Sequence, residues 1–445
     1  MRSSILTAAV AVALTTSGFS AVAKAQDATA QQSAPPATTT PVVHHHSRHR
    51  HAAVQQVAAP GSNMAAELAA RDHEIEELKS AMANLESKVA SLEERTDAQS
   101  DINVSTAKNV ETLQVSATKT DKIEKLVNDT TVGGRMFVDI SDISQKKNGV
   151  ATAKEGVGLD VTRGYLTVTH QFNDIWSGVL TTDFNFVNDP GAAETQLFIK
   201  NLYLQGKFSD AFVFRAGAVP MPWIPYVESF QGYRYVDKMV EDRLGFGNTA
   251  DWGLSASGKL ADGKVDYAAA VINGGGYKNP TRTKSMDVEG RIGFSPIKDT
   301  VIAVGGYSGD LGKETETFNT PNTATRGDAM IAYAKGNNRI GAEYFTASNW
   351  TPGLAIPLTK DKADGYSFWA SYGFTDVLSV FGRYDNVKPS KDLNSTLKDK
   401  YYNFGLQWDV RKGLKVSAVY KNDELKDKSN DQKTQEFGIF GDVSF

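Results

Sequence analysis

The chain has 445 residues, a formal net charge of −4 and no cysteine. The lack of cysteine excludes disulfides, thiolate nucleophiles and cysteine metal sites, and the slightly acidic charge argues against a general affinity for nucleic acid. Hydrophobic residues make up 40% of the chain. No apolar run, however, approaches the roughly 18 residues that a membrane-spanning helix needs.

The N-terminus has the features of an export signal. Arg2 supplies the positive start, residues 5–14 form a short apolar run, and Ala23-Lys24-Ala25 has the small-x-small pattern of a cleavage site. We therefore expect residues 1–25 to be a signal peptide and the mature chain to begin at Gln26.

Residues 26–63 are rich in Ala, Gln, Thr and Pro, a composition that predicts a disordered linker. The linker contains HHHSRHRH, from His44 to His51. Clustered imidazoles are metal ligands in many proteins. The favoured interpretation here is a solvated basic tract that meets an acidic polymer or lipid phosphate, and we expect no metal site.

A heptad pattern follows the linker. From Ile75 to Leu92, apolar residues recur in steps of three and four, which is typical of a coiled coil rather than of a globular helix. We expect this coiled coil within a helix over residues 64–128. The pattern leaves the oligomer number open, although leucine at every d position leans towards dimers. The a positions are Ile75, Met82 and Val89, and the d positions are Leu78, Leu85 and Leu92.

From residue 132 to residue 445 the apolar residues alternate with a period of two, which is typical of strands. Sixteen strands are predicted, and the connections between them are alternately short and long. The predicted strands are 132–142, 158–171, 175–187, 194–207, 211–219, 249–261, 263–274, 285–295, 299–308, 326–335, 338–347, 363–374, 376–387, 400–410, 413–423 and 434–445.

The alternation of connection lengths predicts an outer-membrane barrel. Such barrels have an even number of strands, short periplasmic turns and long outside loops, and they close because hydrocarbon cannot satisfy an open strand edge. A soluble β-sandwich would not explain this alternation. The predicted fold is an all-β membrane protein, a 16-stranded antiparallel outer-membrane β-barrel preceded by an N-terminal periplasmic α-helical coiled coil. One segment, LFIKNLYLQGKF, resists the pattern, because neither register puts all its apolar residues on one side.

The chain ends on FGIFGDVSF, inside the last predicted strand. Four apolar residues of this segment share the face that should meet lipid. We also expect them to form the signal that the barrel-assembly machinery reads. They are Phe437, Ile439, Val443 and Phe445.

The opposite face of the strands carries charges of both signs. A plugged core would avoid them, because an unpaired buried charge is costly, whereas sixteen strands leave room for a water-filled channel. The residues predicted to line the pore lumen are Arg163, Asp183, Arg215, Glu289, Arg291, Arg383 and Asp385.

The longest connection, residues 220–248, is rich in aromatic residues, which are expected to be buried away from water. We expect this loop to fold into the barrel and form a constriction; a partner-binding or receptor loop is the alternative. Its three basic and four acidic side chains predict no clear ion preference. The predicted constriction residues are Tyr226, Glu228, Arg234, Asp237, Lys238, Glu241, Asp242 and Arg243.

Four segments of the chain resemble the phosphate- and polyphosphate-selective porin family (porins O and P). They are RGYLTVTHQF, VFRAGAVPMPWIPYVE, GYRYVDK and DRLGFGNTADWGLSASG. The resemblance covers residues 132–445 and is most specific from Phe214 to Gly258. It implies a trimeric sixteen-stranded porin for small anionic or neutral solutes. In that family, selectivity rests on lumen arginines and constriction lysines, and Arg163, Arg215 and Arg291 are candidate rungs of such a ladder. The predicted constriction differs from that of the family because it has a single lysine. A general or sugar-type porin is therefore an alternative to a phosphate-type porin.

No enzyme and no cofactor are expected. His170 is the only histidine of the barrel region, and its register puts it on the lipid side near a turn, where a catalytic site is not built. The predicted function is a passive diffusion channel of the Gram-negative outer membrane for small hydrophilic solutes or anions. The expected partners are outer-membrane lipid, other copies of the chain in a homotrimer, and peptidoglycan through residues 26–128 in the periplasm. The alternative is a structural protein that links the outer membrane to the cell wall through the coiled coil and the basic linker.

Overall fold

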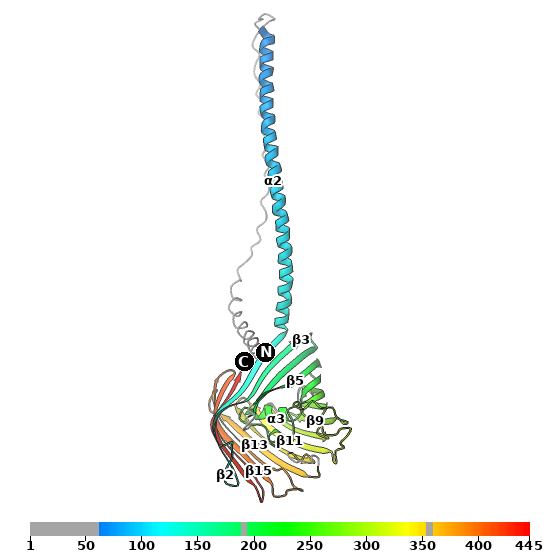
Figure 1. Ribbon diagram of the computed structural model, residues 1–445, viewed down its shortest axis with the longest axis vertical. Coiled ribbons are helices and arrows are strands. Elements are labelled where there is room, and N and C mark those ends of the chain that lie inside the picture. The colour runs from blue at the N-terminus through cyan, green and yellow to red at the C-terminus, as the bar shows by residue number, and fades with distance from the viewer. Residues whose placement is uncertain (1–61, 188–193, 353–358) are drawn as a thin grey trace. The chain divides into compact units, whose positions relative to one another are not determined.

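The computed structural model describes residues 62–187, 194–352 and 359–445 (Figure 1). The predicted signal peptide, the His44–His51 tract and the linker up to residue 61 lie outside the described residues. The chain divides into two units, Met1–Asn103 and Val104–Phe445.

A single helix, α2 (Ser62–Asn128), spans this division. Every side chain from Met64 to Asn128 is exposed, including the heptad residues, of which Met82 and Leu85 are 62% and 60% exposed. Within the described part of the chain, no helix has the length and apolar character needed to cross a membrane. The a and d positions of α2 therefore form an uncovered apolar stripe, and the coiled coil stays a prediction.

The second unit contains seventeen strands. They are β1 (Thr130–Lys147), β2 (Val150–Ala151), β3 (Gly156–Gln171), β4 (Trp176–Val187), β5 (Glu194–Ser209), β6 (Phe212–Pro220), β7 (Ala250–Leu260), β8 (Val265–Ile272), β9 (Asp287–Phe294), β10 (Thr300–Gly309), β11 (Ala324–Lys335), β12 (Asn338–Ser348), β13 (Lys362–Gly373), β14 (Leu378–Lys388), β15 (Lys398–Arg411), β16 (Leu414–Lys426) and β17 (Asp431–Ser444).

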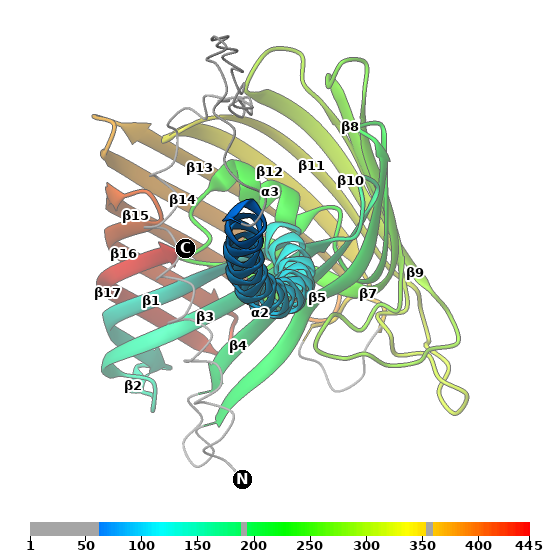
Figure 2. The ribbon, with the colours of Figure 1, turned by 90° about the horizontal axis from the view of Figure 1, so that it is seen from above.

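Sixteen of these strands form a closed barrel, so the predicted sixteen-stranded antiparallel barrel after an N-terminal helix is confirmed (Figure 2). Each barrel strand pairs antiparallel with its neighbours in sequence, and β17 pairs with β1 to close the sheet. The two-residue strand β2 pairs with the end of β1. Closure leaves no strand edge unpaired, which is the condition for a sheet in hydrocarbon.

Several strands extend beyond their predicted bounds, most clearly β1 at its end and β17 at its start. The alternation of apolar residues predicts a first strand that ends at residue 142, whereas β1 reaches Lys147. Its last residues are polar and still pair with β17, for example Ser144 with Gln435 and Lys146 with Lys433. Hydrogen bonding between strands does not require apolar side chains, so the alternation marks only the apolar part of each strand.

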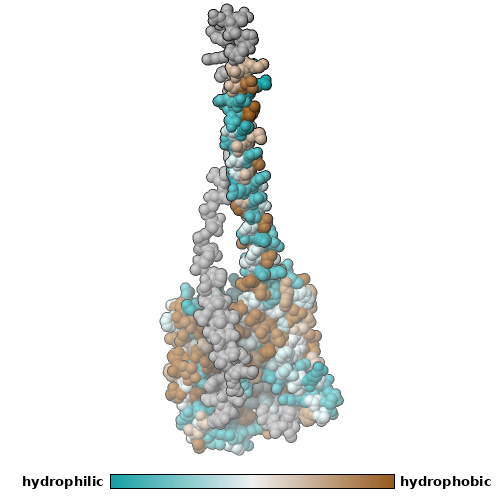
Figure 3. Space-filling model, turned by 45° about the horizontal axis from the view of Figure 1, so that its top comes forward, coloured by the Kyte–Doolittle hydropathy of each residue, from teal (hydrophilic) through white to brown (hydrophobic). Residues whose placement is uncertain are grey.

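The outer face of the barrel carries apolar side chains, as Figure 3 shows for the visible side. Phe437 and Ile439 are exposed on this face, and Val443 is half-buried. The terminal Phe445 belongs to the closing seam, because its backbone N–H and C=O both pair with Gly134 at 3.0 Å. The Phe445 ring lies over Gly134, where a Cβ atom would come within 2.3 Å of it. A larger residue at position 134 would therefore displace the Phe445 ring.

The segment that resisted the alternation contains a β-bulge. Thr181 of β4 pairs with Asn201, but the next residue, Thr182, pairs with Ile199, so Lys200 has no partner on β4. The extra residue reverses the faces of the strand. The exposed apolar residues fall on odd positions before the bulge and on even positions after it: Leu197 and Ile199, then Leu202 and Leu204.

Candidate functional site

The connection between β6 and β7 lies inside the ring of strands (Figure 2). It contains two short helices, α3 (Ile224–Gln231) and α4 (Val240–Leu244). Each helix ends on a glycine in the left-handed conformation, Gly232 with φ 85° and Gly245 with φ 77°. These glycines reverse the chain without steric penalty, which allows a loop of this length to stay within the barrel. We call residues 221–249 the inner loop.

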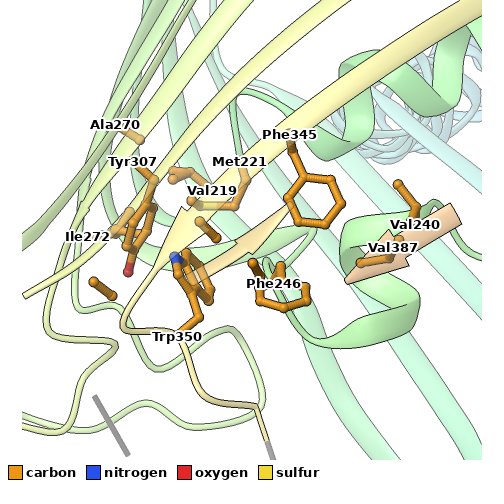
Figure 4. Packing of buried hydrophobic residues seen from close by; sticks show 13 residues of the cluster. Val219, Met221, Val240, Phe246, Ala270, Ile272, Tyr307, Phe345, Trp350 and Val387 are labelled. Atoms are coloured by element: carbon orange, nitrogen blue, oxygen red, sulfur yellow. The ribbon is translucent and has the colours of Figure 1, made fainter. Parts of the chain in front are cut away.

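Apolar contacts hold the inner loop against the barrel wall in three clusters. Figure 4 shows the first of them, in which Phe246 and Val240 of the loop approach Phe345, Trp350 and Val387 of the wall. The other two clusters are built around completely or almost completely buried loop residues. Trp223, Ile224, Val227 and Met239 pack on Val301, Ala303, Met330, Ala332 and Trp369, and Tyr233, Tyr235 and Val236 pack on Phe137, Phe381, Val419 and Phe440.

The clusters show that the barrel wall also carries apolar side chains on its inner face. Phe345, Phe381 and Phe440 point inward, and each is at most 3% exposed. In a lumen filled only with water, these aromatic rings would be exposed to solvent. Their burial by the inner loop supplies the hydrophobic stabilisation that keeps the loop folded inward.

Polar contacts fix the loop backbone at the ends of the clusters. The carboxylate of Glu289 accepts a hydrogen bond from the N–H of Trp223 at 2.8 Å. Arg291 donates to the carbonyl of Pro222 at 3.0 Å and forms an ion pair with Asp266. The guanidinium of Arg291 also stacks on Tyr226, whose hydroxyl donates to Asp266 at 2.9 Å.

Arg326 of β11 is the most enclosed cation at the loop–wall boundary. Its side chain is 0% exposed, and it forms ion pairs with Asp328 at 2.9 Å and with Glu289 at 3.2 Å. It also donates a hydrogen bond to the carbonyl of Phe246, which belongs to the inner loop. Arg326 therefore neutralises two wall carboxylates and binds the loop at the same time.

A second ionic cluster surrounds Arg243 of the inner loop. Its guanidinium forms ion pairs with Asp399 at 2.6 Å, Asp423 at 3.2 Å and Asp385 at 3.3 Å. Asp385 also pairs with Arg383 at 2.6 Å, and Arg383 donates to the carbonyl of Lys238. The loop thus supplies a cation to a wall that carries an excess of carboxylates.

Two loop carboxylates, Asp237 and Glu241, accept hydrogen bonds from aromatic side chains. Asp237 accepts a hydrogen bond from the Tyr401 hydroxyl at 2.9 Å and lies 4.0 Å from the Lys421 ammonium. Glu241 is 1% exposed and accepts a hydrogen bond from the Trp223 indole at 3.2 Å. Burial and the nearby Asp328 raise the pKa of Glu241.

The inner loop leaves open the side of the lumen next to β3 and β5. One cavity of about 260 Å³ lies there, a second of about 800 Å³ lies beside β1, β3, β16 and β17, and both are lined by Arg163, Arg234 and Lys238. We call the smaller cavity the narrow opening. It is lined by Arg163, Tyr165, Lys200, Arg234, Lys238, Asp242, Gly245, Gly247, Asn248, Thr249, Gly275, Gly276, Tyr277 and Lys278.

The charge of the narrow opening differs from that of the loop sequence. Five basic side chains line it, and Asp242 is the single acidic residue among the described residues that do so. The other acids of the inner loop do not line it: Glu241 is buried, Asp237 is half-buried and lines the larger cavity, and Glu228 pairs with Arg234 at 2.7 Å. Counting charges along the loop predicted no ion preference. Of the seven charged residues in that count, only Arg234, Lys238 and Asp242 line the narrow opening.

The predicted site residues therefore separate into three groups. Arg163, Arg234, Lys238 and Asp242 meet at the narrow opening, where Asp183 is buried beneath Arg163 at 2.9 Å. Arg215 lies apart from this opening and donates to Gln205 and Ser257, each at 2.9 Å. The remaining members hold the loop to the wall or to itself: Tyr226, Glu228, Asp237, Glu241, Arg243, Glu289, Arg291, Arg383 and Asp385.

The sequence analysis missed Lys200, Lys278 and Arg326. Lys200 lies on the bulge, so its face could not be read from the alternation. Lys278 belongs to a long polar connection that gave no reason to expect it in the lumen. Arg326 and Asp328 begin a predicted strand with the register of an inward face, and that signal could have been used.

A metal centre has no basis in the described part of the chain, where no three His, Cys, Asp or Glu residues are arranged to hold an ion. His170 lies at a short turn, where its Nδ1 is 2.9 Å from the Thr130 hydroxyl and its ring packs edge-on against Phe172.

No protein-family model matches the chain, and no curated protein matches it. Solved structures do share its fold. OmpF of Salmonella typhi in complex with daunomycin aligns with a TM-score of 0.52 at 13% identity, covering 71% of this chain and 97% of that one. The outer membrane channel DcaP of Acinetobacter baumannii gives 0.51 at 12% identity, with the same two shares.

An anion-selective porin from Comamonas acidovorans aligns with a TM-score of 0.50 at 13% identity, covering 71% of this chain and 99% of that one. Identities this low establish a common barrel fold and nothing finer. The charge lining of the narrow opening is therefore the evidence on which a function has to be argued.

Proposed function

We propose that the protein is a porin of the Gram-negative outer membrane, a passive diffusion channel with a preference for small anions. The observation that carries this proposal is the lining of the narrow opening, with five basic side chains against one acidic side chain. A constriction lined by cations raises the local concentration of anions and repels cations. The barrel folds of the three porins and channels named above support the location and the channel class.

The inner loop is proposed to be the constriction of this channel. It packs on β10, β11, β13, β14, β16, β17 and β1, and it leaves the two cavities as the space that solutes can enter. Phosphate is one candidate solute within the anion class. The comparisons give no support to the alternative role as a link to the cell wall.

The test is the reversal potential of single channels in a planar bilayer across a potassium chloride gradient. We expect stable conductance steps and a reversal potential with the sign of chloride permeation. Addition of phosphate then distinguishes a phosphate-type porin, in which the chloride current falls, from a channel with a general preference for anions. A folded barrel without conductance, or a reversal potential with the sign of potassium permeation, would reject the proposal.

We further propose that α2 pairs with the same helix of other copies of the chain. The heptad stripe from Ile75 to Leu92 is exposed along its whole length, and an uncovered stripe of this kind is stabilised by burial against equivalent stripes. Self-association through α2 would join several barrels into one particle.

Leu85→Asp should lower the temperature at which the oligomer of the full-length protein separates, because it places a charge in the heptad core. Ala83→Asp, two residues away at a b position, adds the same charge outside the core and should have little effect. Light scattering of the detergent-purified protein gives the number of copies. Equal dissociation temperatures for both variants and the unmodified chain would contradict pairing through this stripe.

A further inference from the structure

We propose that lysines on the outer face of the barrel bind the phosphate groups of membrane lipids. They lie on β14 to β17 and on β1, at the end of the barrel away from Thr130, where the first strand begins. This inference goes beyond the proposed channel, because it concerns the lipid side of the wall and takes only the outer-membrane location from that proposal. We call these residues the outer lysines: Lys146, Lys388, Lys398, Lys400, Lys426 and Lys433.

The outer lysines point away from the lumen, as the alternation of their strands shows. Gln145, the residue before Lys146, lines the larger cavity, and its side chain donates to the hydroxyl of Thr434, the residue after Lys433, at 2.9 Å. The two outer lysines of β15 flank Asp399, which is buried and pairs with an arginine of the inner loop. Successive residues of a strand face opposite sides. The neighbours of these inward residues therefore face outward, and all six outer lysines are exposed.

Strand pairing places four of the outer lysines opposite one another. Lys146 of β1 pairs directly with Lys433 of β17, and Lys398 of β15 pairs directly with Lys426 of β16. Directly paired residues share a face of the sheet, and their Cβ atoms are about 4.5 to 5.5 Å apart. The two ammonium groups of each pair can therefore reach the same phosphate and donate to different oxygen atoms of it, in hydrogen bonds between charged partners.

Few acids compensate the charge of the outer lysines. Lys426 forms an ion pair with Asp431 at 2.7 Å. Among the described residues, no carboxylate oxygen lies within 4.0 Å of the ammonium of the other five. Glu424 is the single acid in register with them, between Lys400 and Lys433.

Like charges directly opposite each other destabilise a sheet, and this barrel contains two such pairs close together on one face. A surface that only had to be hydrophilic could avoid this cost with acids at the opposite positions. An anion bound between the two lysines of a pair would remove the repulsion. The cross-strand lysine pairs are therefore the observation that points to an anionic ligand.

Aromatic residues on the same face show the depth of the outer lysines in the membrane. The rings of Tyr402 and Tyr420 are 6.1 Å apart, and Tyr420 pairs with Phe437 of the next strand. Outward rows of aromatic rings lie where hydrocarbon meets the polar headgroups. Lys400 lies two residues beyond Tyr402, and Lys433 lies four residues beyond Phe437, both away from the hydrocarbon. The outer lysines are therefore at the level of lipid headgroups.

This location selects a lipid over a dissolved anion. A solute that crosses the channel does not meet the outer face. A lipid, in contrast, can place its chains on outward apolar residues such as Phe404 and Leu406, which are exposed, while its phosphate lies at the lysines of the same strands. Each basic residue near a membrane surface adds to the attraction for anionic lipids.

The probe is phosphatidic acid, a lipid whose headgroup is a phosphate monoester. Full-length protein in an uncharged detergent is titrated with it, and mass spectra of the intact protein count the bound lipids. We expect saturable binding of one lipid at each lysine pair. Lys146→Gln/Lys433→Gln and Lys398→Gln/Lys426→Gln should each abolish one tight site, by raising its half-saturating concentration about thirtyfold. Lys146→Arg/Lys433→Arg keeps both charges and should retain the site.

The matched control is Lys284→Gln/Lys313→Gln. These two exposed lysines lie in the connections after β8 and β10, at the same end of the barrel, so the variant loses the same charge from the same end and should bind as the unmodified protein does. Phosphatidylcholine with the same chains, and inorganic phosphate, should not displace phosphatidic acid. The migration of unheated protein in gels shows that each barrel is folded.

Equal loss of binding in the control variant, or displacement by phosphatidylcholine, would overturn the inference. Displacement by inorganic phosphate would do so too, because it would show a site for a dissolved anion. None of these results depends on conductance, so they leave the proposed channel standing. A channel without chloride preference would reject the proposed function and leave the lipid site unaffected.

Discussion

Arg326→Met is expected to release the inner loop from the barrel wall. The substitution leaves the carboxylates of Asp328 and Glu289 buried without their cation, and it removes the hydrogen bond to Phe246. Breaking a buried ion pair from one side costs about 3 to 5 kcal/mol. Single-channel recordings should therefore show a larger and noisier conductance. Trypsin added to intact channels should cut the loop after Arg234 or Lys238.

The control for this variant is Arg282→Met. Arg282 lies in the connection between β8 and β9, where its side chain is exposed, so the same chemical change should leave conductance and trypsin resistance unaltered. The migration of unheated protein in gels reports whether the barrel of each variant is intact. An intact Arg326→Met barrel with the conductance of the unmodified protein would show that the apolar clusters alone hold the loop.

Replacement of the inner loop by a tight turn is expected to produce the largest change in conductance. The two ends of the loop lie side by side, because the N–H of Met221 donates to the carbonyl of Thr249 at 3.1 Å. Residues 223–247 can therefore be exchanged for Asn-Gly, a pair suited to a two-residue hairpin turn. Conductance should rise several-fold as the lumen fills with water. The chloride preference should fall, since Arg234 and Lys238 are removed.

In the unmodified protein, carboxylates and arginines of the wall face the inner loop. In this variant they would be exposed to water, which is a favourable environment for charged side chains. The inward aromatic rings would be the main loss, so thermal stability should fall as well. Exchange of residues 314–319, in the connection between β10 and β11, for the same turn is the control and should leave conductance unchanged. Unchanged conductance after removal of the inner loop would rule out its role as the constriction.

The number of strands and their order could be read from the sequence. Alternation of apolar residues depends only on which face meets an apolar environment, and this is a local property of each strand. The same rule predicted strand ends that were too short, because polar residues such as Ser144 and Lys146 continue the hydrogen-bonded ladder of β1. The exposed Phe437 and Ile439 lie on the outer face, as their register predicted.

The segment LFIKNLYLQGKF shows the limit of pattern analysis within a strand. A bulge shifts the pairing between β4 and β5, and no residue type in the segment marks the position of the shift. The register is set by hydrogen bonds to a neighbouring strand. Lys200 was therefore missed as a residue of the opening, although its segment had been recognised as irregular.

The lumen shows what pattern analysis cannot predict about contacts between segments that are distant in the sequence. Inward aromatic residues such as Phe381 and Phe440 contradicted a purely polar lumen, and the loop that covers them is distant in sequence. A count of loop charges could not reveal that Glu241 is buried while Arg234 and Lys238 line the narrow opening.

By itself the sequence determined the class of fold, the strand count, the outer face and the loop that would need cover, because each follows from local spacing of apolar residues. Tertiary structure alone decided which wall the loop covers, which charges neutralise one another and which remain at the narrow opening. Pairing of charges depends on distances between residues far apart in the chain, and those distances exist only once the barrel has closed.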